Sequence, residues 1–70
     1  MQRKPVSSSQ IRSLGHDPAT QTLEVEFHAG GVYQYTGVDA ATHDAMAMAD
    51  SIGAHFHSNI RGKFPFRKVS

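Results

Sequence analysis

Seven basic side chains stand near the two ends of the chain, and their distribution is the strongest hint of a binding chemistry. They are Arg3, Lys4, Arg12, Arg61, Lys63, Arg67 and Lys68. All six acidic residues lie between these two groups, so the net charge of +1 hides a marked asymmetry. Basic ends are usually solvated tails, but two basic ends that meet in the fold would form a patch for a polyanion.

Phenylalanines alternate with the C-terminal cations. A surface that combines cations with aromatic rings can contact phosphates and stack bases. We therefore expect any nucleic-acid interface to lie at the C-terminal end, and Arg3 and Lys4 could add to it. The candidate residues are Arg61, Lys63, Phe64, Phe66, Arg67, Lys68 and Arg12.

Five histidines raise the question of a metal site. They are His16, His28, His43, His55 and His57. His55 and His57 are two residues apart, which on a helix separates them by about 200° and prevents them from sharing an ion. The other three lie on different predicted elements, with no Cys and no helical His-Glu pair nearby. We expect no metal site and no cofactor.

Two other groups contain residue types that are common in active sites. Glu24 and Glu26 would share one face of a strand, which is typical of the solvated side of a half-buried sheet. The serines at 7–9, with His16 and Asp17, lack a strained nucleophile turn and an oxyanion hole. A core this small also leaves little room for a pocket. We therefore expect neither an enzyme nor a small-molecule substrate.

The element that must position these side chains is a β-hairpin over residues 23–35, where two alternating apolar and polar runs flank a glycine turn. A two-residue turn at Gly30 and Gly31 would give a half-polar face. A three-residue loop at 29–31 instead places Phe27 opposite Tyr33 and makes one face apolar. We expect this second register, which turns Tyr33 and Tyr35 toward the core instead of offering them as a stacking platform.

The remaining elements follow on either side of the hairpin. Residues 10–16 predict a first strand, in which Gly15 permits a bulge. Asp39 is expected to cap a helix over 40–49 with an apolar stripe that includes Met48 and is broadened by Met46. Ser51 is expected to cap a second helix that ends before Gly62. The predicted fold is α+β: a three-stranded antiparallel β-meander with one face covered by two short helices, followed by a basic extended C-terminal arm.

The chain of 70 residues is long enough for one domain with a small core. We expect a flexible leader over 1–9, a single domain over 10–62 and a basic aromatic arm over 63–70. Pro65 lacks a ladder donor, so the arm could be an edge strand or an extended tail. The absence of cysteine, of a secretory signal and of a long apolar run predicts a cytoplasmic protein with no membrane partner.

Several motifs together resemble the KTSC domain family. They lie at residues 6–9, 23–27, 32–35, 49–53 and 59–64, together with Phe56. The resemblance covers residues 6–69, and the combination of Tyr-x-Tyr, Ser-x-Gly and Asn-Ile-Arg is specific. His16, His43 and His57 depart from the family pattern; if they are packing positions, His16 or His43 should have a hydrogen-bond partner.

The family is named for its occurrence at the C-terminus of some lysyl-tRNA synthetases, and it also occurs as stand-alone small bacterial proteins. Its function is uncharacterised, and the synthetase association implies RNA, either tRNA or single-stranded, as a partner. We therefore expect a non-catalytic RNA-binding module. The alternative is a protein-interaction or oligomerisation module that uses a sheet edge or the C-terminal arm.

Overall fold

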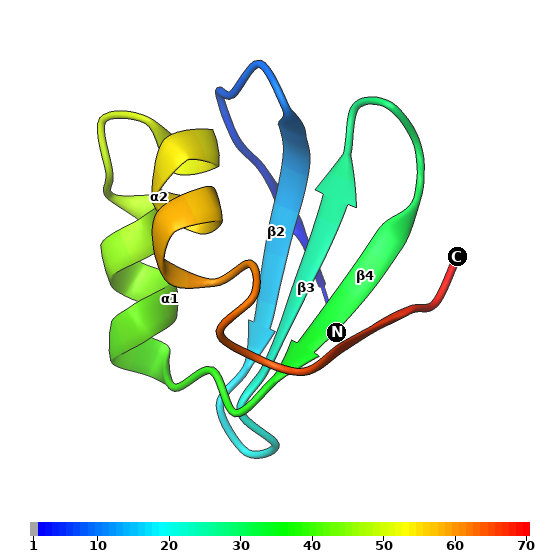
Figure 1. Ribbon diagram of the computed structural model, residues 1–70, viewed down its shortest axis with the longest axis vertical. Helices are drawn as coiled ribbons and strands as arrows, with labels where there is room; N and C mark the ends of the chain where they lie inside the picture. The colour runs from blue at the N-terminus through cyan, green and yellow to red at the C-terminus, as the bar shows by residue number, and fades with distance from the viewer. Residues whose placement is uncertain (1) are drawn as a thin grey trace.

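The computed structural model describes residues 2–70, which form an antiparallel sheet of five strands and two helices (Figure 1). The strands are β1 (Lys4–Pro5), β2 (Ile11–Asp17), β3 (Thr22–Phe27), β4 (Val32–Thr36) and β5 (Phe66–Lys68), and the helices are α1 (Ala40–Ala47) and α2 (Ile52–Asn59). The order of the strands in the sheet follows the chain. The α+β class and the central meander are confirmed. The count of three strands is wrong, because β1 and β5 add one strand at each edge.

These two strands lie in the segments expected to be a leader and an arm. Lys4 pairs with Leu14, and Phe66 pairs with Tyr35. Pro65 stands just before β5, and its carbonyl accepts from the N–H of Thr36 at 3.0 Å, so the missing proline donor interrupts no ladder bond. The C-terminal segment therefore contains an edge strand, which is one of the two predicted alternatives. Met1 of the expected leader lies outside the described residues, and the flexibility of the leader stays a prediction.

The central hairpin has a three-residue loop, as expected, but the loop is residues 28–30. Phe27 donates its N–H to the carbonyl of Gly31 at 3.2 Å and accepts from the N–H of Gly30 at 3.0 Å. Gly30 adopts a φ of +105°, the left-handed position of a bulged turn. Tyr33 consequently pairs with Val25 instead of Phe27. The register differs from the prediction by two residues, and an even shift leaves every side chain on its predicted face.

An irregularity in β2 brings two apolar residues of unequal phase into one core. Ile11 pairs with Phe27 and Ser13 pairs with Glu26, so the bulge falls at Arg12 and not at Gly15. Ile11 and Leu14 are both buried. The bulge therefore has the expected effect at a different position.

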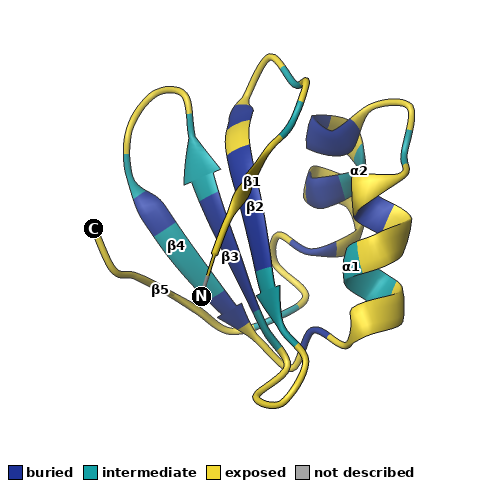
Figure 2. Ribbon diagram, turned by 180° about the vertical axis from the view of Figure 1, so that it is seen from behind, coloured by how far each residue is buried: buried dark blue, intermediate teal, exposed yellow. Residues whose placement is uncertain are grey.

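Both helices begin where their caps predict. The Asp39 side chain accepts from the N–H of Thr42 and the Ser51 hydroxyl from that of Ala54. Phe56 on α2 is buried in the core, and Figure 2 shows buried segments in both helices. Of the two methionines on the predicted stripe, Met46 is buried as expected, whereas Met48, the C-cap of α1, is 84% exposed. Neither helix among residues 2–70 is long and apolar enough to cross a bilayer.

The core lies between the helices and one face of the sheet. Its fully buried large side chains are Ile11, Leu23, Val25, Val38, Met46, Phe56 and Ile60. In Figure 1 the helices lie beside β2, and β4 is farther from them. The helices therefore leave the β4–β5 side of this face less covered than the β2 side.

The opposite face of the sheet holds a polar network. Arg3, next to β1, donates to a carboxylate oxygen of Glu24 and to the Ser13 hydroxyl, and Gln34 donates to the other oxygen of Glu24 at 2.9 Å. Burial alone would raise the pKa of Glu24, but the hydrogen bonds from Gln34 and Arg3 and the charge of Arg3 outweigh it. The pKa of Glu24 is therefore below its usual 4.5. The sheet face that carries Glu24 is predicted to be solvated, but Glu24 itself is buried.

A lowered folded-state pKa makes the network a source of stability that disappears in acid. The stabilisation is fully present above the unfolded pKa of Glu24 and is lost as the pH falls through the lower folded value. We predict that Arg3→Met lowers the free energy of unfolding by about 1–2 kcal/mol at neutral pH. This difference should shrink well below pH 4.5, as measured by urea unfolding at several pH values. Arg12→Met, an exposed arginine of β2, is the control and should change little; an Arg3→Met deficit that persists unchanged in acid would contradict this account.

Candidate nucleic-acid interface

The pairing of β4 with β5 divides the predicted C-terminal site between the two faces of the sheet. Phe66 lies opposite Tyr35 and Lys68 lies opposite Tyr33, so these four side chains share the face on which the helices lie. Arg67 lies on the other face, where its Nη2 donates to Gln34 at 3.4 Å. The alternation of the strand thus separates Arg67 from its two neighbours.

The other predicted residues are also dispersed. Arg12 lines a hollow with Arg3 and Glu26 on the side of the sheet away from the helices. Phe64 is half-buried and packs against the core, and Lys63 is exposed in the turn after α2. Of the seven predicted residues, the structure brings Arg61 and Phe66 into one groove, with Lys68 next to it.

This groove, which we call the aromatic groove, has a volume of about 550 Å³ and lies between α2 and strands β3 to β5. Its aromatic lining comes from Phe27, Tyr33, Tyr35 and Phe66, with Phe56 beneath. The Phe66 ring centroid lies 5.9 Å from that of Tyr33 and 5.4 Å from that of Tyr35. Phe66 is 60% exposed, so an aromatic surface is open to solvent here.

The two tyrosines of β4 have different surroundings. Tyr35 is buried, as the hairpin predicted, and burial raises the pKa of its phenol although the charge of Arg61 opposes this. Tyr33 is only half-buried and lines the groove. Tyr33 does pack against the core, as predicted, but part of its side chain also faces the groove, because the apolar face extends beyond the helices. Phe66 on the same face is the signal in the sequence that could have shown this.

A polar rim closes the groove on the side of α2. The Nε2 atom of His57 lies 2.8 Å from Oε1 of Gln10, and the Nη1 atom of Arg61 lies 3.4 Å from Nδ1 of His57. All three residues line the groove. Of these three, only Arg61 is predicted as a site residue, since Gln10 is 47 residues from His57 in the sequence and no motif links them.

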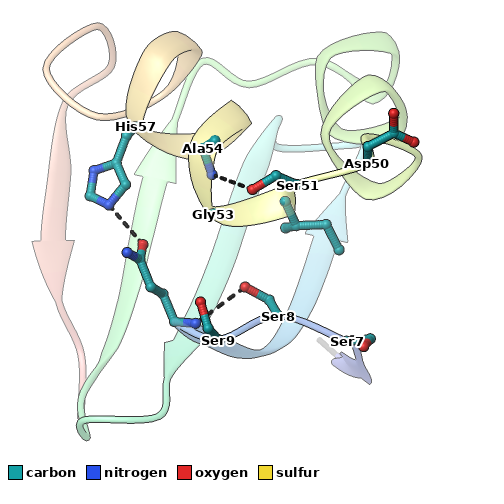
Figure 3. A pocket seen from close by; sticks show the side chains of 10 residues that line it. Ser7, Ser8, Ser9, Asp50, Ser51, Gly53, Ala54 and His57 are labelled. Atoms are coloured by element: carbon teal, nitrogen blue, oxygen red, sulfur yellow. Dashed lines mark hydrogen bonds between the residues drawn. The ribbon is translucent and has the colours of Figure 1, made fainter.

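A second pocket, of about 440 Å³, adjoins the groove at the start of α2 and is lined by serines 7–9, Ser51 and Gly53 (Figure 3). Ser9, Gln10 and His57 line both spaces. In Figure 3 the His57 ring points toward the residues that precede β2. The hydroxyls of Ser8 and Ser51 already accept backbone N–H groups, so they complete local turns.

Two of the remaining histidines, His16 and His43, pack against each other. His16 Nε2 lies 2.6 Å from the carbonyl of Val38, and the His16 ring stacks on His43 with centroids 5.0 Å apart. His16 is thus a packing residue with a hydrogen-bond partner, as expected for a packing position. Within residues 2–70, no three His, Asp or Glu side chains gather where they could share a metal ion.

Comparison with known proteins gives a consistent result. The family model described as the KTSC domain matches residues 7–64. An uncharacterised protein of Stutzerimonas stutzeri is 47% identical over 57 residues, which are 81% of this chain and 80% of that protein. The crystal structure of a KTSC domain protein from Yersinia pestis superposes with a TM-score of 0.96 at 46% identity, covering 99% of this chain and 97% of that one.

Longer proteins contain the same unit. A lysine–tRNA ligase of Nostoc punctiforme is 39% identical over 62 residues, and one of Trichormus variabilis is 37% identical over 60. These matches cover 89% and 86% of this chain but only 11% of each ligase. The chain therefore spans about a tenth of the length of these relatives.

The position of the Tyr33 ring in the aromatic groove can be tested by glycine substitutions. A Cβ on Gly31 would lie 3.1 Å from Cε1 of Tyr33, whereas one on Gly30 would meet no atom within 4 Å. Both glycines have positive φ, so either alanine variant should cost about 1–2 kcal/mol of stability. Only Gly31→Ala should also displace the Tyr33 ring and shift its NMR signals. If Gly30→Ala shifts them equally, the ring is not seated as described.

Proposed function

Because the chain belongs to the KTSC domain family, we propose that it is a non-catalytic module that binds unpaired RNA in the aromatic groove. The observation that carries this proposal is the half-buried Tyr33 and the exposed Phe66 in one groove, beside two cations, Arg61 and Lys68. Rings that stack bases next to cations that meet phosphates are the usual elements of single-strand binding. A cytoplasmic location is part of the same proposal.

The proposed site includes only some of the residues predicted from the charge distribution. It keeps Arg61, Phe66 and Lys68 and adds Tyr33. Arg67 and Arg12 fall on the opposite face, where Glu24 and Glu26 also lie. Unlike-charged neighbours reduce the attraction of that face for phosphate.

RNA is the favoured nucleic acid because similar sequences form part of proteins named lysine–tRNA ligase. The name states what those enzymes act on, and the domain is only 11% of their length. We propose that in this chain the domain contributes binding and no catalysis. Its partner would be a single-stranded RNA or an unpaired region of a tRNA.

A second candidate function is supported by β5. This strand forms one edge of the sheet, and its three residues are exposed. An exposed edge can add a strand from another chain. Sedimentation over a wide concentration range tests self-association at this edge, and a monomer throughout would exclude it.

The stacking surface is tested by removing a ring that the fold does not need. Phe66→Ala should weaken binding of a fluorescein-labelled single-stranded RNA roughly 5- to 150-fold, since one stacked base is worth about 1–3 kcal/mol. Fluorescence anisotropy measures the affinity. Met48→Ala removes an apolar side chain that is even more exposed, at the C-terminal cap of α1, and is the control. Equal affinities for the two variants would rule out stacking on Phe66.

The cation contribution is tested by salt. Affinity should fall steeply as salt rises, and Lys68→Gln should lower the slope of log K against log salt by about one phosphate contact, ~0.7 for a single strand. Arg12→Gln, on the opposite face, should leave the slope unchanged. Absence of binding at low salt by the wild-type chain would refute the proposed function.

A further inference from the structure

The rim of the aromatic groove has a defined hydrogen-bond direction. An arginine side chain has only donors, so His57 Nδ1, which faces Nη1 of Arg61 at 3.4 Å, must present a lone pair. The proton of the neutral ring is then on Nε2. That N–H donates to Oε1 of Gln10 at 2.8 Å. The guanidinium thereby fixes both the tautomer of His57 and the orientation of the Gln10 amide.

This direction leaves donors facing the groove. The carbonyl oxygen of Gln10 is occupied by His57, and its amide nitrogen has two hydrogens. Arg61 retains N–H groups beyond the one near His57. The hydroxyls that also line the groove, those of Ser9, Tyr33 and Tyr35, can either donate or accept. The part of the rim formed by Gln10 and Arg61 therefore favours a ligand edge that supplies acceptors.

We infer that the groove selects an unpaired guanine, stacked at Tyr33 and Phe66 and read on its Hoogsteen edge by Arg61 and Gln10. That edge of guanine has two adjacent acceptors, N7 and O6, and arginine binds such a pair with two parallel N–H groups. The same edge of adenine has one acceptor and the N6 amino donor. An adenine would place that donor against a donor rim, which disfavours it. This inference rests on the proposed RNA binding.

The test uses fluorescein-labelled uridine octamers that carry one central variable base, titrated by anisotropy. The guanine and inosine octamers, which share N7 and O6, should bind equally. Both should bind at least about fivefold more tightly than the adenine octamer, the lower bound for a bidentate base contact. The octamer with 7-deazaguanine, which lacks the N7 acceptor, should bind with an affinity between those of the guanine and adenine octamers.

Variants connect the preference to the rim. Arg61→Lys replaces the planar fork by a point charge and should lower the guanine-to-adenine ratio toward one. Arg67→Lys makes the same change on the opposite face of the sheet and should preserve the ratio.

The outcomes separate the two claims. Salt-dependent binding with equal affinity for all four octamers would mean that Arg61 meets only phosphate; the inference would then be overturned while the proposed function stood. Failure of every octamer to bind at low salt would reject the proposed function itself.

Discussion

The alternation of side chains along β4 and β5 is the constraint on which the proposed site depends. Successive residues of a strand point to opposite faces. The pairing of Tyr35 with Phe66 therefore puts both rings on the helix side, and Arg67, the next residue along, on the other. A slip of one residue in this pairing would exchange the two sets and abolish the aromatic groove.

The groove exists because the buried core does not extend to β5, the strand at one edge of the sheet. Strands β2 and β3 supply many of the fully buried core residues, whereas all three residues of β5 are exposed. On the opposite face, the Arg3 guanidinium covers Glu24 and pairs with its carboxylate. One face thus has an internally paired polar surface, and the other has uncovered aromatic rings next to Arg61.

The sequence predicted those parts of the fold that repeat or cap. The alternation in β3 and β4 assigned both faces, and Ser51 marked the start of α2. The hairpin register was wrong by two residues because adjacent glycines offer two places for the bulge, and hydrophobic alternation cannot distinguish even shifts. β1 is too short for a periodic signal, and Pro65 weighed against a strand that begins immediately after it. Charge alone predicts Arg67 and Phe66 in one site. They lie on opposite faces of the sheet, which follows only once β5 is known to be a strand paired with β4.

The most direct test of the central claim is an NMR titration of isotope-labelled protein with a single-stranded RNA octamer, which maps the contact on the folded domain. The account predicts that the side-chain signals of Tyr33, Phe66 and Arg61 shift together and saturate at one RNA per chain. Shifts confined to the opposite face, around Arg12 and Arg67, would contradict it.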